Sequence, residues 1–532
     1  MRVLLPLPVL LPLAGAALTL LLGHRPRAQR AVSLLALTGV VAAAAALLAR
    51  CAGGRVQHLT VGGWPDGVGI ALVADRLSSL LLLTSATVAL AVMVFSVGQG
   101  RTGDPASTPV SIYHPTYLAM TAGVAIAFLA GDLFNLYVGF EVLLTSSYVL
   151  LTLGGTARRV RAGTTYVVVS LVSSLVLLTG VGLVYAATGT VAMADLPARL
   201  AALDPGVATA LQLTLLIAFG LKAAAFPLSG WLPDSYPAAA APVAAVFAGL
   251  LTKVGVYAVL RTHGVLFGQG TLRELFLAVA LATMLLGILG AVVQHDLRRV
   301  MSFTLVSHIG YMLFGVGLGS SAGLAAAVFY AVHHILVQTA LFLVVGLVEQ
   351  RTGTTDVRRL GGLAAASPAL GLLFLLPGLN LAGIPPFSGF LGKLALLRAG
   401  VDDGGWDAWA LVVASVVTSL LTLYAIARVW AAAFWHGGDR SATGAGGRAP
   451  EEVPDDAPQR AGGGAAVAAR PRASRAPAAA TAGVVVLVTA LTVVAGPLAA
   501  LARGAAEDTG DGRRYSGVVG GVVGGGAGTG AP

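Results

Sequence analysis

The chain has 532 residues, of which 57% are hydrophobic and only 11% are charged, and its mean hydropathy is +0.86. A soluble domain carries about 25% charged residues, whereas apolar runs of ~20 residues, long enough to cross a bilayer as helix, recur here from end to end. This composition excludes an ordinary soluble domain, and the net charge of +10 reports on membrane topology rather than nucleic-acid binding. The single cysteine, Cys51, excludes an internal disulfide and a cysteine-cluster metal or iron–sulfur site.

The apolar runs predict an all-α polytopic membrane protein with about 14 transmembrane helices. The expected spans are 3–22, 31–50, 77–98, 116–131, 133–153, 163–187, 206–226, 236–262, 274–293, 300–319, 321–348, 368–396, 407–434 and 478–501. The first run is too long for a typical signal-peptide core, so we expect it to be retained. Pro227, Pro233 and Pro237 break the seventh helix. Pro385 and Pro386 break the twelfth. Such breaks are tolerated at membrane depth where they line protein or a water-filled cavity.

A short motif occurs at both breaks: residues 227–231 read PLSGW and residues 386–390 read PFSGF, 159 positions later. Many transporters are built from two repeats with the site at broken helices. We therefore expect helices 1–3 in 1–115, a first repeat (helices 4–8) in 116–262, a second, inverted repeat (helices 9–13) in 274–435, a disordered cytoplasmic linker in 436–477, the last transmembrane helix in 478–501 and a disordered Gly-rich tail in 502–532.

Loop arginines are concentrated in the connections that follow odd-numbered helices, including the cluster from Arg440 to Arg475. Positively charged connections stay in the cytoplasm. The pattern predicts cytoplasmic odd-numbered connections and places both chain termini outside.

The three lysines all lie in apolar segments, whereas the other 30 of the 33 basic residues are arginines. Arg keeps its proton in proteins, but Lys can release it when desolvated. A GC-rich genome would explain the abundance of Arg but not the positions of Lys222, Lys253 and Lys393. These positions predict proton handling inside the membrane. Lys222 precedes the first break, whose free carbonyl groups favour an ammonium group.

One of the six glutamates, Glu141, lies in the middle of an expected span. A charge at the bilayer centre costs roughly 2.5–3.5 kcal/mol on insertion scales. We predict that Glu141 is a protonatable group coupled to Lys222, because each would stabilise the other's charged form. The alternative is a carboxylate paired with a cation for packing. Asp132, at the mouth of the same helix, is either an end cap or an entrance residue.

The other two lysines are predicted to extend the path. Lys253 lies between Gly249 and Gly255, small residues that permit close contact between helices, and is predicted to be a central relay group. Lys393 follows the second break and is a candidate for the far end of the relay. For both lysines the alternative is structural pairing.

Three histidines complete the set of ionisable candidates, because His titrates near neutral pH. His334 and Gln338 share a helix face at i, i+4, His333 points to another face, and His308 is either a relay member or a packed hydrogen-bonding group. We expect no metal site without Cys, Asp or Glu at ligand spacing, and no cofactor motif is present. The predicted proton relay is Glu141, Lys222, Lys253, His334 and Lys393, with Asp132, His308, His333 and Gln338 as accessory residues.

Four segments resemble the proton-translocating subunit family shared by respiratory complex I and Mrp-type cation/proton antiporters: GDLFNLYVGFEVLLTSSYVLL, LKAAAFPLSGWLPDSYPAAAAPVAAVFAGLLTKVGVYAVLR, QHDLRRVMSFTLVSHIGYM and LAGIPPFSGFLGK. The resemblance covers roughly residues 70–435 and is strongest to the D-subunit branch. It implies a fourteen-helix core with two inverted five-helix repeats. It also implies that Glu141 is the family's fifth-helix glutamate. The lysines of the broken seventh helix, the eighth helix and the broken twelfth helix would be Lys222, Lys253 and Lys393.

Three positions in the family pattern help to distinguish the antiporter branch from the complex I branch and limit the possible relay. Complex I relatives have P-L-H-x-W-L-P-D, but Ser229 replaces the histidine here, which favours the antiporter branch. One complex I subunit has a glutamate at the position of Lys393, so the lysine here argues against an assignment to that subunit. Gln338 stands where a lysine is common, so the second-half relay must use His333, His334 or water.

The resemblance implies a secondary transporter subunit rather than an enzyme. We expect a proton-conducting subunit of a sodium (or other cation)/proton antiporter, driven by the proton-motive force, in a hetero-oligomeric complex in the bacterial plasma membrane. No cofactor and no nucleic-acid partner are expected. One alternative is a proton-pumping subunit of NADH–quinone oxidoreductase or a membrane-bound hydrogenase. A second alternative is a scaffold that retains the fold without translocating protons.

Overall fold

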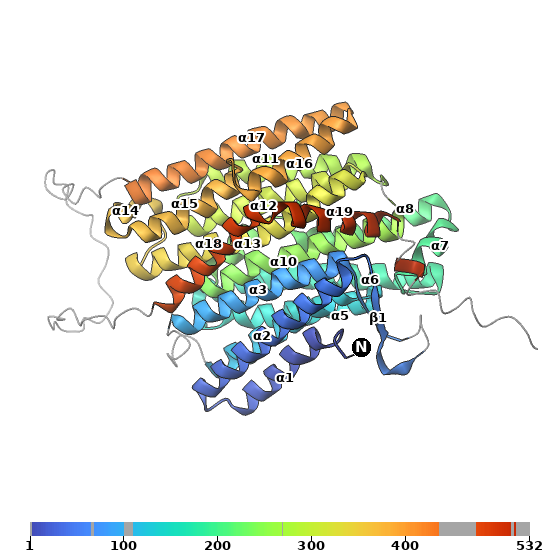
Figure 1. Ribbon diagram of the computed structural model, residues 1–532, viewed down its shortest axis with the longest axis horizontal. Coiled ribbons are helices and arrows are strands. Elements are labelled where there is room, and N and C mark those ends of the chain that lie inside the picture. The colour runs from blue at the N-terminus through green and yellow to red at the C-terminus, as the bar shows by residue number, and fades with distance from the viewer. Residues whose placement is uncertain are drawn as a thin grey trace, which may run out of the picture.

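The computed structural model describes residues 3–64, 69–99, 110–268, 270–435, 475–511 and 515–517. Within these ranges, twelve helices are long and apolar enough to cross a membrane, and Leu7–Leu21 and Pro368–Ala382 are shorter apolar helices. The long helices run roughly parallel to one another (Figure 1). The prediction of an all-α polytopic membrane protein is confirmed at this level.

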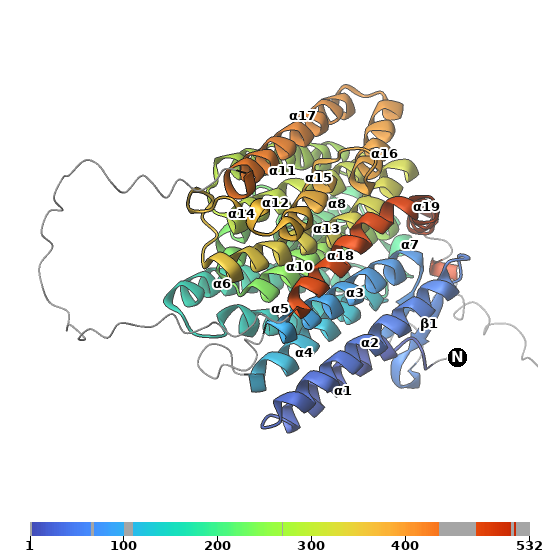
Figure 2. The same ribbon diagram turned by 60° about the vertical axis from the view of Figure 1, so that its left-hand side comes forward.

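The N-terminal part lies along one side of the bundle, opposite α17, in both views (Figures 1 and 2). It contains α1 (Leu7–Leu21), α2 (Pro26–Cys51), β1 (Gln57–Thr60), the 3₁₀ turn η1 (Val61–Gly63), β2 (Ala71–Ala74) and α3 (Arg76–Gly98). The strands β1 and β2 form an antiparallel hairpin that pairs Gln57 with Ala74 and Thr60 with Ala71. This hairpin was not predicted, because four-residue strands are too short to show a reliable alternating pattern.

The middle of the chain contains α4 (Val110–Leu129), α5 (Leu133–Thr152), α6 (Ala157–Thr188), α7 (Leu196–Ala201), α8 (Pro205–Ala223), α9 (Leu232–Ser235), the 3₁₀ turn η3 (Tyr236–Ala238), α10 (Ala241–Thr262) and the π-helical turn η4 (His263–Phe267). The next part contains α11 (Arg273–Val293), α12 (Leu297–Gly317), α13 (Ser321–Thr352), η5 (Val357–Arg359), α14 (Leu363–Ala366), α15 (Pro368–Ala382), α16 (Ser388–Asp403), α17 (Trp406–Val429) and the π-helical turn η6 (Trp430–Trp435).

The C-terminal part differs from the prediction. The expected helix 478–501 is two helices, α18 (Ala476–Val493) and α19 (Ala495–Asp511), so α19 extends ten residues into the segment assigned to the tail. Its position is fixed by an ion pair between Asp508 and Arg76, with Nε and Oδ2 2.9 Å apart. A Gly-rich composition alone could not reveal this tertiary contact. Most of the predicted linker (436–474) and of the tail (512–514 and 518–532) lies outside the described residues.

The core of the bundle is formed by α10 and α13, which lie between the N-terminal helices and α17 (Figure 2). The membrane-spanning windows of both are fully buried within the protein, whereas only 33% of the α2 window is buried. The two helices approach closely at Gly249, where an added Cβ would lie 2.4 Å from Oγ1 of Thr339. Most of the candidate ionisable residues therefore lie on or beside the most enclosed helices of the bundle.

One connector occurs twice with the same local structure. Thr188-Gly189-Thr190 follows α6 and Thr352-Gly353-Thr354 follows α13, 164 positions later, and each glycine has a positive φ. In both copies the first threonine hydroxyl donates to the carbonyl of the last one and accepts from its N–H group. Each connector then makes a β-bridge to the residue that precedes another helix, Asp132 before α5 and Asp296 before α12.

Candidate functional site

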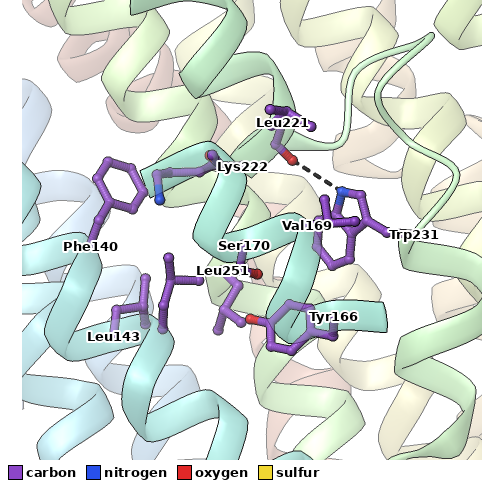
Figure 3. A pocket seen from close by; sticks show the side chains of 11 residues that line it. Phe140, Leu143, Tyr166, Val169, Ser170, Leu221, Lys222, Trp231 and Leu251 are labelled. Carbon is purple, nitrogen blue, oxygen red and sulfur yellow. Dashed lines mark hydrogen bonds between the residues drawn. The ribbon is translucent and has the colours of Figure 1, made fainter. Parts of the chain in front are cut away.

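The first half of the site is organised by the end of α8. Ala224 takes a left-handed conformation (φ 58°) and Pro227 follows, so the helix stops just after Lys222. The end is capped by other parts of the chain. The indole N–H of Trp231 donates to the carbonyl of Leu221 at 3.1 Å (Figure 3), and the N–H of Phe226 donates to a threonine hydroxyl of α11 at 3.0 Å. The interrupted backbone therefore has defined partners on both sides.

The Lys222 side chain lies in a mostly apolar pocket and is only 7% exposed. Its Nζ donates to Oγ of Ser174 on α6 at 3.3 Å and lies 4.7 Å from the centroid of the Phe140 ring, within cation–π range. The pocket encloses a cavity of about 20 Å³ bordered by Tyr166, Ser170 and Trp231 among others (Figure 3). A cavity needs roughly 10–15 Å³ on this measure to hold one water molecule. The amine therefore has a weak hydroxyl partner and room for one water.

Glu141 lies next to Phe140 on α5 and is half-buried. The Lys222 Nζ lies 4.7 Å from the ring of Phe140, the neighbour of Glu141 in α5, but no direct ion pair joins the Glu141 carboxylate to the Lys222 ammonium group. The Oε1 atom of Glu141 is buried and has no hydrogen-bond partner among the described residues. The structure thus places Glu141 near the Lys222 pocket without an ion pair between the two side chains.

The first break also packs tightly against α10. An added Cβ on Gly255 would lie 2.6 Å from the backbone N of Ala223, so only glycine allows this approach. Two residues earlier, Lys253 is 1% exposed, and its Nζ donates to the carbonyl of Ala248 in its own helix at 2.6 Å. Gly249 and Gly255 are both close-contact positions, as the sequence predicted.

The second half of the site is a cluster of rings on α12 and α13. The rings of His308 and His334 stack with centroids 5.4 Å apart, and the Tyr330 hydroxyl lies 2.7 Å from Nδ1 of His308. Lys253 interacts electrostatically with both histidines. On the neighbouring face, Nδ1 of His333 lies 3.1 Å from Oγ of Ser388 at the second break.

Lys393 lies on α16, beyond the second break, and is 4% exposed. Its Nζ donates to the carbonyls of Leu381 and Ala382, at 3.0 and 2.9 Å, which are the last carbonyls of α15. It also lies 5.0 Å from the centroid of the Tyr311 ring. The carbonyl end of a helix stabilises a cation. Lys393 interacts electrostatically with all three clustered histidines.

Several buried polar atoms on α13 and α10 have no hydrogen-bond partner among the described residues: both ring nitrogens of His334, Nε2 of His333 and Oε1 of Gln338 on α13, and Oγ1 of Thr252 on α10. Each buried polar group without a hydrogen bond lowers the stability of the fold by about 1–3 kcal/mol. Native proteins retain some such groups because they serve a function. Gln338 donates to the carbonyl of Met301 at 2.6 Å, but no hydrogen bond or ring contact joins it to a described lysine or histidine.

Asp132 forms the N-terminal cap of α5. Its Oδ1 accepts from the N–H of Asn135 at 2.6 Å, and its Oδ2 accepts from the N–H of Ala71 in β2 at 3.4 Å. Burial raises the pKa of Asp132, and these hydrogen bonds offset the effect only in part. Of the two roles considered for this residue, the geometry supports the end cap directly.

The sequence did not reveal a buried ion pair at the end of α10. Arg261, near the end of the expected span 236–262, is 2% exposed, and its guanidinium donates two hydrogen bonds to the Asp75 carboxylate, at 2.5 and 2.9 Å. Burial opposes ionisation of Asp75, but the Arg261 guanidinium outweighs burial and holds the pKa of Asp75 below its usual value. The predicted span includes Arg261, but nothing in the sequence indicates its partner 186 positions away.

The chain is similar in sequence to known proteins. The family model described as "NADH:quinone oxidoreductase/Mrp antiporter, TM" matches residues 130–422. The D-subunit of the Na(+)/H(+) antiporter of Alkalihalophilus pseudofirmus is 36% identical over 432 residues, which cover 81% of this chain and 86% of that protein.

Two solved structures extend the comparison to the fold. A chain of the Mrp complex from Dietzia sp. DQ12-45-1b is 33% identical with a TM-score of 0.85, covering 98% of this chain and 100% of that one. A chain of respiratory complex I from Thermus thermophilus is 25% identical with a TM-score of 0.77, covering 96% and 99%. The chain therefore belongs to the NADH:quinone oxidoreductase/Mrp antiporter transmembrane family, and within it groups with the D-subunits of the Mrp antiporters.

Proposed function

We propose that this chain is the proton-conducting membrane subunit of a multisubunit Na⁺ (or other monovalent cation)/H⁺ antiporter in the bacterial plasma membrane, driven by the proton-motive force. It is a secondary transporter subunit rather than an enzyme. The similarity to antiporter D-subunits along 81% of the chain supports this, as does the likeness to a chain of the Mrp complex. The partners would be the other subunits of such a complex.

The proposal includes fourteen membrane crossings: the twelve long spans, α1, and α15 with α16 as one interrupted span. It also includes two inverted repeats, α4–α10 and α11–α17. The repeated Thr-Gly-Thr connectors and their β-bridges to Asp132 and Asp296 support this division. Between these two aspartates the chain runs through α5, α6, α8, α10 and α11. Because five crossings separate them, the two connectors would lie on opposite membrane faces, as inverted repeats require.

One observation carries the proposed relay. The Tyr311 ring lies 5.0 Å from the Nζ of Lys393 and 5.3 Å from the His308 ring, which stacks on His334. A continuous row of rings therefore runs from the lysine beyond the second break to α13, the helix that packs against α10 and its Lys253. The unpartnered ring nitrogens of His334 can take up or release a proton without first breaking a protein hydrogen bond.

The Glu141–Lys222 pair would load this path from the first half. A desolvated lysine favours its neutral form, whereas a nearby carboxylate favours the ammonium form. Protonating Glu141, or wetting the small cavity beside Lys222, would therefore shift the proton affinity of the lysine. Lys253 follows next along α10, and Gly255 holds that helix against the backbone at Lys222.

The main alternative couples the same machinery to electron transfer in an NADH–quinone oxidoreductase or a membrane-bound hydrogenase. The likeness to the complex I chain supports a shared fold, but the identity of 25% is lower than the 36% shared with the antiporter protein. Neighbouring genes discriminate between the two: small antiporter subunits favour the first, and iron–sulfur and flavin subunits the second.

The proposed role of Glu141 is tested by ΔpH-driven exchange in everted vesicles from cells that express the whole operon. We expect Glu141→Ala to lower Na⁺-dependent exchange tenfold or more, equivalent to about 1.4 kcal/mol or more on the transport barrier, at normal expression. The control is Glu274→Ala, which removes an exposed carboxylate in the first turn of α11. Normal exchange by the Glu141 variant would rule out a role in the relay.

A further inference from the structure

A cavity of about 320 Å³ lies on the other side of the first break from Lys222. Every residue that lines it is apolar or glycine, including Gly220, Phe226 and Pro227 at the break and Val279 on α11. It shares no lining residue with the small cavity beside Lys222, although both border residues 220–231. The break thus separates the small pocket that holds Lys222 from a larger one with no polar side chain in its lining.

The apolar cavity opens onto the outer surface of the bundle. Three of its lining residues are large and exposed: Ile217 (48%), Phe226 (37%) and Leu275 (38%). The membrane windows of α8 and α11 are only 44% buried within the protein. Because both helices have the length and composition of membrane spans, this face meets the hydrocarbon of the bilayer.

One end of the cavity leads to a buried polar cluster. A second, smaller cavity shares Leu216, Val259 and Phe276 with the large one and is bordered by Gln212 and His263. These two polar residues are each 6% exposed, and Nε2 of Gln212 lies 3.2 Å from Nδ1 of His263. It also donates at 2.8 Å to the hydroxyl of Thr271, in the connection between α10 and α11. The polar end is therefore near the membrane edge, and the apolar part lies deeper.

The volume of the cavity indicates which kind of molecule can occupy it. On the measure used for the cavity beside Lys222, where roughly 10–15 Å³ holds one water molecule, a cavity of about 320 Å³ has room for a run of methylene groups. A helix of about 10 Å diameter would fill the same volume in less than one turn of about 5.4 Å. A narrow chain with a polar end therefore fits, whereas a partner helix does not.

We propose that the cavity binds one acyl chain of a membrane phospholipid, with the ester end toward the Gln212 and His263 end of the cavity and the hydrocarbon against the break at Phe226 and Pro227. The bound chain would support the break from the side opposite Lys222. This inference depends on the membrane fold and not on the transport activity, so it can fail without the proposed function failing.

Photo-crosslinking tests the site directly. The assembled complex is incubated in vesicles of phosphatidylglycerol that carries a diazirine in one acyl chain, irradiated and mapped by mass spectrometry. We expect adducts on the peptide that contains Phe226. Val279→Trp fills the cavity from α11 and should lower that yield several-fold. Leu289→Trp, on the same helix at a 50% exposed position that does not line the cavity, should leave it unchanged.

Leu275→Trp is a second variant that blocks the opening from an exposed position, so a folding defect of Val279→Trp does not decide the result. It should lower the Phe226 adduct in the same way. Two results would overturn the proposal. The first is a Phe226 yield no higher than that around Leu289, or one that neither cavity variant lowers. The second is labelling of Phe226 in the isolated subunit but not in the complex, which would mean that a partner chain covers the opening.

Discussion

The two broken helices each hold a buried lysine, but they surround it differently. Lys222 precedes its break, donates to a single serine hydroxyl and lies within electrostatic range of Glu141. Lys393 follows its break, donates to two backbone carbonyls of α15 and has no carboxylate as an ion-pair partner among the described residues. The first lysine thus has a carboxylate nearby, whereas the second has the fixed dipoles of two carbonyl groups and neighbouring imidazoles.

In the proposed relay, this difference would give the two halves different tasks. A carboxylate that gains or loses a proton changes the affinity of the nearby lysine, so the first half can be switched locally. Backbone carbonyls keep the same partial charge throughout, so Lys393 depends on the state of the histidine cluster. We therefore expect single substitutions to have sharper effects in the first half and more distributed effects in the second.

The largest expected effect on stability is at a charge pair that belongs to neither lysine site. Asp75→Asn leaves the Arg261 guanidinium buried without its counter-charge, which should cost about 3–5 kcal/mol. The measurement is thermal unfolding of the purified complex in detergent. Asp356→Asn, which alters the surface pair with Arg358 at 3.1 Å, should change little. Equal melting of the two variants would mean that the buried pair does not stabilise the fold.

Gly255→Val tests whether α10 positions the first-half lysine. Its Cβ would lie 2.6 Å from backbone atoms of α8, so the helices must separate at a cost of about 1–3 kcal/mol, and exchange should fall several-fold.

Two other glycines serve as controls for this variant. Gly249→Ala meets the Thr339 hydroxyl of the second half, a side-chain atom that can move aside, and should cost less. Gly182→Val meets nothing within 4 Å and should be neutral. Normal exchange by the Gly255→Val variant would show that the packing of α10 against α8 does not determine the position of Lys222.

A smaller contrast lies within the histidine cluster. His308→Leu leaves the Tyr330 hydroxyl without its partner, so it should destabilise the complex by about 1–3 kcal/mol. His334→Leu removes two unpartnered nitrogens and should leave thermal stability unchanged or higher, yet lower exchange several-fold. Both properties are measured on the same vesicle and detergent preparations. Full exchange by the His334 variant would exclude this residue from the relay.

The sequence predicted those features that depend on local patterns. Apolar runs locate the helices, prolines locate both breaks, and each buried lysine stands out because every other basic residue is Arg. Contacts between distant segments could not be predicted, because nothing local encodes them: the Asp75–Arg261 pair, the Tyr330–His308 contact and the docking of α19 through Asp508. Gln338 illustrates the limit, since its spacing from His334 indicated a shared path, but its amide donates to Met301 instead.

The central claim is that Lys222 releases and regains a proton rather than acting as a fixed charge. The most direct test is ΔpH-driven, Na⁺-dependent exchange by Lys222→Arg in everted vesicles, normalised to assembled complex. Arg retains the positive charge but does not release its proton. The relay predicts that this variant assembles but does not exchange. An assembled and active Lys222→Arg variant would show that the site needs only a fixed positive charge, and would contradict the relay.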